Sequence, residues 1–91
     1  MNYTYRATEN FWRNFYALPA AQKDSVRSAW AIFKTYPFDP RLSAHKIQRL
    51  SDIMKKTVYA VVIENDLRAV FYIEKNVVIT FNVGTHDIYK R

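Results

Sequence analysis

Residues 57–83 read TVYAVVIENDLRAVFYIEKNVVITFNV, and this stretch decides the fold. Runs rich in β-branched and aromatic residues occupy 57–63, 67–73 and 77–83, and such runs favour β-strands. The polar triplets between them, Glu64-Asn65-Asp66 and Glu74-Lys75-Asn76, are typical of tight turns. Strands joined by tight turns pair antiparallel, so the stretch predicts a three-stranded antiparallel meander.

Side chains of a strand alternate between two faces, which assigns the residues of the second and third runs. One face of the second run is predicted to hold Leu67, Ala69, Phe71 and Ile73, and the opposite face Arg68, Val70 and Tyr72. In the third run, one face is expected to hold Val77, Ile79, Phe81 and Val83, and the other Val78, Thr80 and Asn82. The more apolar face must be covered, so Arg68 and Tyr72 should project from an uncovered face.

The first half of the chain supplies the cover. After Thr8, a plausible N-cap, one apolar stripe at helical spacing is formed by Phe11, Trp12, Phe15 and Tyr16. Leu18-Pro19 interrupts this pattern, and a second amphipathic helix is predicted over 20–35, before Pro37 and Pro40. The two helices form a hairpin over the sheet. Short additional strands are expected at 3–6 and 45–49.

The expected fold class is therefore α+β, with two N-terminal antiparallel helices packed on a twisted, mainly antiparallel sheet of four to five strands. With 91 residues, the chain has room for a single domain spanning 1–91. It contains no cysteine, which excludes disulfides and thiolate catalysis, and it shows no signal peptide and no apolar run long enough to span a membrane. These features favour a cytoplasmic protein.

The charge is strongly basic, with 14 Lys and Arg against 8 Asp and Glu and a formal net charge of +6. Residues 41–56 hold five basic residues against Asp52 alone. Such a field attracts polyanions, with nucleic acid first and an acidic protein second, although a merely solvated charged face is the alternative. Two histidines without a fixed carboxylate spacing do not form a metal signature, and with a single glycine no phosphate-binding loop exists, so no metal or cofactor is expected.

The order of motifs resembles the RelE/ParE superfamily of bacterial toxins, with the RelE-like branch favoured. The motifs are Leu18-Pro19 between helices, His45-Lys46 after a Pro-containing loop, the strand 66–71 that starts Asp-Leu-Arg, and a closing segment 83–89 that reads VGTHDIY. The resemblance covers nearly the whole chain. It implies the toxin of a type II toxin–antitoxin pair that cleaves mRNA, free or on the ribosome, without a metal. A ParE-like gyrase inhibitor and a degenerate toxin that only binds its antitoxin are the alternatives.

The resemblance also implies roles for single residues. Arg68 matches the sheet arginine that contacts the scissile phosphate, although it could instead pair with Glu64 or Asp66 on the surface. His86 matches a C-terminal general acid, because imidazole exchanges protons near neutral pH, or else only caps the last strand. Tyr89 matches an aromatic that stacks on a base or assists proton transfer, with packing as the alternative. Lys46 matches a catalytic basic position.

Further basic and aromatic residues are expected to bind RNA phosphates and bases: His45, Arg49, Lys55, Lys56 and Tyr72. Ordinary solvated lysines are the alternative for Lys55 and Lys56, and the segment 52–56 departs from the family pattern, which leaves the general base unassigned. Asp87 could orient His86 or pair with Lys90. The expected partners are an antitoxin, in a heterotetramer or larger complex, and RNA with or without the ribosome.

Overall fold

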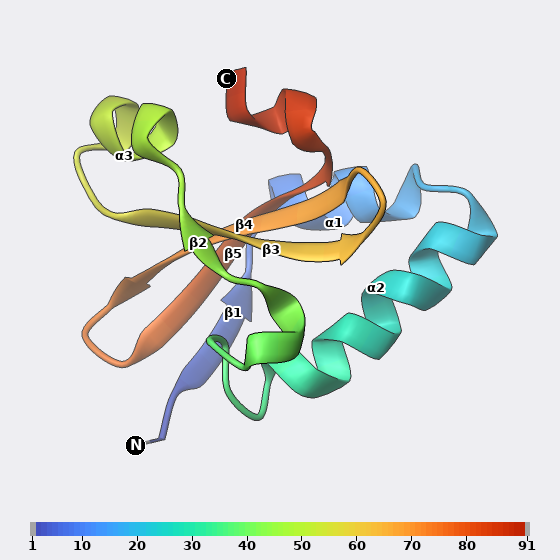
Figure 1. Ribbon diagram of the computed structural model, residues 1–91, viewed down its shortest axis with the longest axis horizontal. Helices are drawn as coiled ribbons and strands as arrows, with labels where there is room; N and C mark the ends of the chain where they lie inside the picture. Colours follow the sequence, from blue (N-terminus) through green and yellow to red (C-terminus); the bar gives the residue numbers. More distant parts are fainter. Residues whose placement is uncertain (1, 91) are drawn as a thin grey trace.

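A five-stranded sheet in the order β1-β5-β4-β3-β2 runs through the computed structural model, which describes residues 2–90 (Figure 1). The strands are β1 (Thr4–Ala7), β2 (His45–Lys46), β3 (Val58–Glu64), β4 (Leu67–Glu74) and β5 (Val77–Thr85). The helices are α1 (Glu9–Tyr16), α2 (Ala20–Phe33), α3 (Gln48–Met54) and the 3-10 helices η1 (Pro40–Leu42) and η2 (His86–Lys90). Among the described residues, no helix is long and apolar enough to cross a membrane.

The central meander is confirmed, because β4 pairs antiparallel with both β3 and β5. Asn65 and Lys75 take positive φ values of 40° and 58° in the two turns, a conformation that asparagine tolerates better than most residues. The expected N-terminal edge strand is present as β1, which pairs parallel with β5.

The expectation of a strand over 45–49 is wrong beyond Lys46. Only His45 and Lys46 pair with β3, and the chain then turns into α3. The buried Ser51 ties this helix to the sheet, since its hydroxyl accepts a hydrogen bond from Val58 N at 2.9 Å and donates one to Ile47 O at 2.8 Å.

The two N-terminal helices form as predicted. Thr8 caps α1, where its hydroxyl accepts a hydrogen bond from Phe11 N at 3.2 Å, and α2 ends at Phe33, two residues before the predicted end. Apolar side chains of both helices pack with one face of the sheet into the main core, around the fully buried Phe71. The Phe71 ring lies 5.0 Å from Phe33 and 5.4 Å from Tyr59, measured between centroids.

The predicted faces of β5 are wrong, because this strand contains a β-bulge. Phe71 lies opposite Thr80 and Val70 lies opposite Asn82, so Phe81 has no partner of its own. One extra residue inverts the alternation beyond it. Val78 and Val83 therefore both enter the main core, whereas Phe81 packs on the opposite face.

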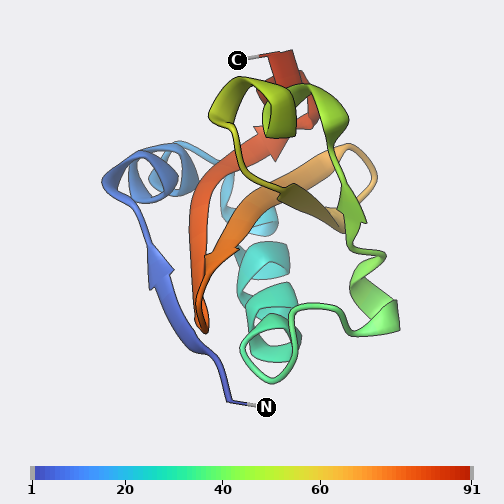
Figure 2. The same cartoon turned by 90° about the vertical axis from the view of Figure 1, so that its left-hand side faces the viewer.

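The sequence pattern predicted that the opposite face of the sheet is bare, and this prediction is wrong. A second apolar core covers part of it, built on Val58, Ala60 and Val70 of the sheet with Ile47 and Leu50 beside them. The half-buried members of this core come from α3, β5 and η2: Met54, Phe81, Ile88 and Tyr89. Figure 2 shows α3 and η2 together at the end of the sheet where β5 finishes. This second core fixes the C-terminal segment against the sheet.

Candidate functional site

The strongest constellation of reactive side chains lies where η2 meets the turn between β3 and β4. Leu67 of β4 lies opposite Thr85 of β5, so the residues one step outward, Asp66 and His86, come together. The Nδ1 atom of His86 donates a hydrogen bond to the Asp66 carboxylate. An Nδ1–H held in this way leaves the Nε2 atom free to exchange a proton. The His86 side chain is 59% exposed, so the pair is open to a substrate.

The electrostatics of Asp66 agree with this pairing. The hydrogen bond from His86 holds the pKa of the Asp66 carboxyl below its usual value, and the positive charge of Arg68 adds a smaller contribution in the same direction. Asp66 is therefore ionised at neutral pH and can accept the Nδ1 hydrogen bond that orients the imidazole ring. Of the two roles that the sequence left open for Asp87, the structure shows the pair with Lys90, whose Nζ lies 3.4 Å from the Asp87 carboxylate.

Arg68 occupies the expected face of β4 and is held by the turn before it. Its Nη1 atom donates to the carbonyl oxygens of Asn65 at 2.6 Å and Leu67 at 3.2 Å. Within residues 2–90, the guanidinium makes no salt bridge with Glu64 or Asp66. Both bonds use one nitrogen, so the rest of the fork is available for an anion.

Tyr89, in η2, lies close to Arg68. Burial raises the pKa of the Tyr89 hydroxyl, and the nearby positive charge of Arg68 opposes part of that rise. The hydroxyl is buried and has no hydrogen-bond partner within the described residues. The structure thus gathers Asp66, Arg68, His86 and Tyr89 at one end of the sheet, and this set is called the tail cluster below.

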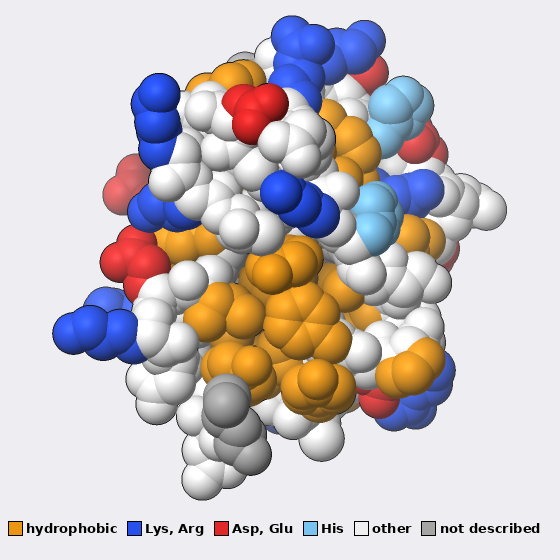
Figure 3. Space-filling model, turned by 60° about the vertical axis from the view of Figure 1, so that its left-hand side comes forward, with side chains coloured by type: hydrophobic (Ala, Val, Ile, Leu, Met, Phe, Trp, Pro, Cys, Tyr) orange, Lys and Arg blue, Asp and Glu red, His pale blue; other side chains and the backbone are white. Residues whose placement is uncertain are grey.

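His45 lies on the same face of the sheet, at a distance. It is opposite Ala60 of β3, and directly opposed side chains share a face, which here is the face of Val62 and Arg68. Figure 3 shows both histidines of the chain on one face, with charged side chains beside them. Two strand spacings separate β2 from β4, roughly 10 Å. His45 is therefore near the tail cluster without belonging to it.

Lys46 is not brought to the tail cluster. It lies opposite Tyr59, whose ring stacks on Phe71 in the main core, so Lys46 shares the face of the helical hairpin. Lys56 is also apart, since its Nζ donates to Glu74 Oε1 at 2.9 Å and sits 4.2 Å from the centre of the Tyr72 ring. This hydrogen bond raises the pKa of Lys56, the opposite of what a lysine general base requires.

Lys56 and Tyr72 lie well away from Arg68. Tyr72 and Arg68 are four positions apart along β4, about 13 Å at the rise of a strand. Tyr72 also packs against Phe81, with ring centroids 5.6 Å apart. Arg49 and Lys55 are exposed on and just after α3. These basic residues extend the charged surface beyond the tail cluster rather than completing it.

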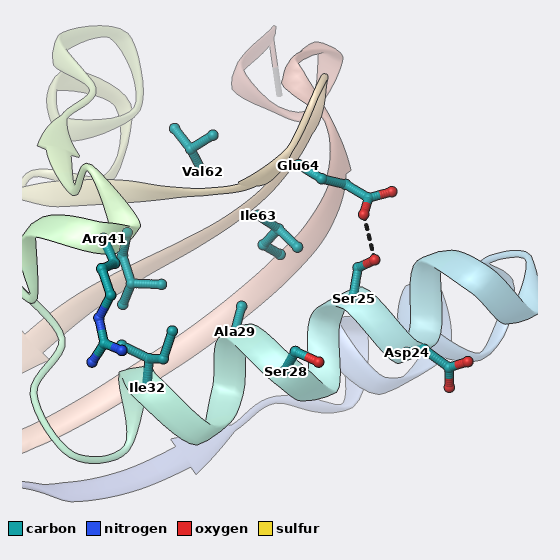
Figure 4. A pocket seen from close by; sticks show the side chains of 10 residues that line it. Asp24, Ser25, Ser28, Ala29, Ile32, Arg41, Val62, Ile63 and Glu64 are labelled. Atoms are coloured by element: carbon teal, nitrogen blue, oxygen red, sulfur yellow. Dashed lines mark hydrogen bonds between the residues drawn. The ribbon is translucent and has the colours of Figure 1, made fainter.

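A separate pocket of about 340 Å³ lies on the other side of β3, between that strand and α2 (Figure 4). Inside it, the Ser25 hydroxyl donates a hydrogen bond to the Glu64 carboxylate. Arg41 also lines it, but its guanidinium is bound to the Asp39 carboxylate at 3.0 Å. This pocket contains none of the reactive residues expected from the sequence. No group of three or more metal-ligating side chains occurs within the described residues either.

No protein-family model matches the sequence, and no curated protein matches it either. Solved structures do match. A chain of the archaeal RelE–RelB complex from Pyrococcus horikoshii superposes with a TM-score of 0.69 at 13% identity, over 93% of this chain and 96% of that one. YafQ from E. coli gives 0.68 at 15% identity, over 96% and 97%.

A copper-bound mutant toxin from Helicobacter pylori gives a TM-score of 0.64 at 16% identity, over 94% of this chain and 97% of that one. At such identities the likeness concerns the fold. The α+β fold expected from the sequence is therefore confirmed: the chain has the RelE-like fold over nearly its whole length.

Proposed function

We propose that this chain is the toxin of a toxin–antitoxin pair and that it cleaves RNA at the tail cluster without a metal ion. The observation that carries the proposal is the meeting of Arg68, Tyr89 and the Asp66–His86 pair at one end of the sheet. The RelE-like fold supports it, since one structural neighbour is part of a RelE–RelB complex and another is described as a toxin. The net charge of +6 suits an RNA substrate.

Cleavage uses the substrate's own 2′-hydroxyl as the nucleophile. Its oxygen bonds to the adjacent phosphorus and its proton passes to solvent water, while the bond from phosphorus to the 5′-oxygen breaks. The products are a 2′,3′-cyclic phosphate and a free 5′-hydroxyl. His86, protonated and oriented by Asp66, donates its Nε2 proton to the departing 5′-oxygen. The free guanidinium nitrogens of Arg68 bind the phosphate oxygens on which negative charge accumulates.

Tyr89 and His45 have supporting roles in this proposal. The buried Tyr89 hydroxyl lies close to Arg68, and its role here is to position the guanidinium rather than to touch the substrate. His45 lies on the same face of the sheet as Arg68, but two strands away from β4. Its role in this proposal is to bind a neighbouring nucleotide rather than the reacting phosphate. Lys46 receives no catalytic role, because it lies on the opposite face of the sheet.

The test is cleavage of a defined RNA by the purified protein in the presence of EDTA, with the new ends identified by mass spectrometry. We expect 2′,3′-cyclic phosphate ends, and a loss of about 10²–10⁴-fold in rate for His86→Gln. Arg68→Ala should be similarly impaired, whereas the exposed Lys34→Ala is the matched control for removal of a positive charge. Repeating the assay with ribosomes present covers cleavage that requires them.

The proposal is overturned if His86→Gln cleaves as fast as the unmodified protein, or if RNA stays intact under both conditions. Intact RNA together with inhibited DNA gyrase would instead support the ParE-like alternative. If the His86→Gln variant is still toxic to a host cell, that result would also support the ParE-like alternative.

A further inference from the structure

The pocket between α2 and β3 lies outside the tail cluster, and its charged groups take no part in the proposed reaction. It encloses about 340 Å³. Figure 4 shows Glu64 and Ser25 toward one end of it, and Arg41 and Ile32 toward the other. Its aliphatic lining comes from Ala29, Ile32, Leu42 and Ile63. The pocket therefore combines a carboxylate, a guanidinium and an apolar floor.

The carboxylate of Glu64 has no positive partner. Of the eight acidic residues, six pair with a basic side chain within residues 2–90: Glu9, Asp24, Asp39, Asp66, Glu74 and Asp87. Asp52 and Glu64 do not, and Asp52 is exposed whereas Glu64 is half-buried. One oxygen of Glu64 accepts a hydrogen bond from the neutral Ser25 hydroxyl. A carboxylate partly removed from water gains from a cation beside it, so this end of the pocket suits an ammonium group.

The edge of β3 beside the pocket offers main-chain groups as well. β2 pairs only with Tyr59 and Ala60, so within the described residues β3 has no strand on its outer side after Ala60. Ile47 N donates to Val58 O, which shows that Val58 directs its polar groups outward. Every second residue of an antiparallel strand does the same, so Val62 presents an N–H and a C=O at the pocket. A ligand that contains a peptide bond can hydrogen-bond to this edge.

The end of the pocket at Arg41 suits a carboxylate. The Nε and Nη2 atoms of Arg41 each donate to Asp39 at 3.0 Å, which leaves Nη1 available for an anion. α2 lines the pocket from Asp24 to Ile32, about 12 Å at the rise of an α-helix. Two extended residues span about 7 Å, and a polar contact of about 3 Å at each end brings the total to about 13 Å. A dipeptide matches this length, whereas a single amino acid is too short.

The net charge of the chain also favours a ligand with both charges. A chain of +6 repels polycations, so a cation that approaches Glu64 binds best when the ligand carries a balancing negative charge. We propose that this pocket binds a free aliphatic dipeptide, with its ammonium group on Glu64 and its carboxylate on Arg41. The peptide bond lies along Val62, and the aliphatic side chains contact Ile32 and Ile63. The inference does not depend on RNA cleavage, because its readout is binding.

The experiment is isothermal titration calorimetry of the full chain with leucyl-leucine as the probe. The acetylated dipeptide N-acetyl-leucyl-leucine lacks the ammonium group, and leucyl-leucine amide lacks the carboxylate. We expect each to bind at least about tenfold more weakly than leucyl-leucine, because each loses one charged hydrogen-bonded contact. Free leucine should also bind more weakly, since it reaches only one end of the pocket.

Variants of the two charged ends connect the binding to this pocket. Glu64→Gln keeps the shape of the side chain and should weaken leucyl-leucine binding about tenfold. Asp52→Asn, at the other carboxylate without a basic partner, is the matched control and should bind normally. Arg41→Gln should weaken the binding of leucyl-leucine but not that of its amide, which has no carboxylate to lose. In NMR titrations, the amide signals of Val62 and Glu64 should shift.

The proposal is overturned if leucyl-leucine does not bind, or if Glu64→Gln binds it as tightly as Asp52→Asn does. It is also overturned if free leucine or either blocked dipeptide binds as tightly as leucyl-leucine. Tight binding of both blocked forms would point instead to an internal segment of a longer chain. RNA cleavage is measured separately, so the proposed function can stand where the dipeptide proposal fails.

Discussion

The absence of a side chain at Gly84 lets η2 pack closely against the sheet. Gly84→Ala tests whether this packing sets the geometry of the tail cluster. A Cβ atom at position 84 would lie 3.0 Å from Cγ2 of Ile88. Carbon atoms in ordinary contact are about 3.5–4.0 Å apart, so one partner must move by a few tenths of an ångström. Gly84 is held in β5 opposite Arg68 of β4, whereas no side chain of η2 within the described residues is fully buried. The helix η2 should therefore move.

The cost to global stability should be small, and the cost to the site large. Overpacking that a surface segment can relieve should cost about 1 kcal/mol. A displacement of about 1 Å at reacting groups can reduce the rate on the order of 100-fold, and a shift of a few tenths of an ångström reduces it less. Gly84→Ala should thus slow RNA cleavage about tenfold while the midpoint of thermal unfolding falls by only roughly 4–8 °C.

Two readouts make the result decisive. Single-turnover cleavage gives the rate, and NMR titration of Asp66 reports whether His86 still donates to its carboxylate. In Gly84→Ala, the pKa of Asp66 should rise toward its usual value, because the hydrogen bond that lowers it is lengthened. An unchanged Asp66 pKa together with an unchanged rate would refute this account of η2.

Three further predictions concern single contacts. Thr8→Ala removes the cap of α1 and a bond to β5, and should lower the free energy of unfolding in urea by about 1 kcal/mol. The hydrogen bond from Arg41 lowers the pKa of Asp39 to about 2, so Arg41→Ala should raise that pKa toward 3.8 in NMR titrations. Because the pKa is lowered, this pair stabilises the fold above about pH 4 and loses its contribution as the pH falls toward 2. Asp66→Asn should slow RNA cleavage at least about tenfold, whereas Asp87→Asn should not, as measured in the same single-turnover assay.

The sequence predicts the meander and the helical hairpin because both depend on local signals: turn triplets, period-two alternation and the Leu18-Pro19 break. It does not predict α3. With seven residues, this helix is too short for periodicity to identify, and its stability comes from tertiary contacts of Leu50 and Ser51 with the sheet. The prediction of a bare sheet face was wrong for the same reason.

The pairing of Asp66 with His86 could not be predicted from the sequence for a different reason, the β-bulge in β5. Counted back from the turn at 74–77 without a bulge, Asp66 would lie opposite Thr85, and His86 would lie beyond it. The extra residue at Phe81 shifts the register by one and brings Asp66 and His86 together. The signal for such a bulge is long-range, since Phe81 O is held by side chains of Thr8 and Asn10. Asp87, adjacent to His86 in sequence, pairs with Lys90, the alternative that the sequence had left open.

The second core explains why a tail of five residues can carry a site at all. Without it, the chain would leave β5 at Thr85 in an extended direction, and His86 would point into solvent away from Arg68. Ile88 and Tyr89 instead pack against the sheet face around Val70, which turns the tail back over β4. The position of His86 beside Asp66 therefore depends on apolar contacts made two and three residues further along the chain.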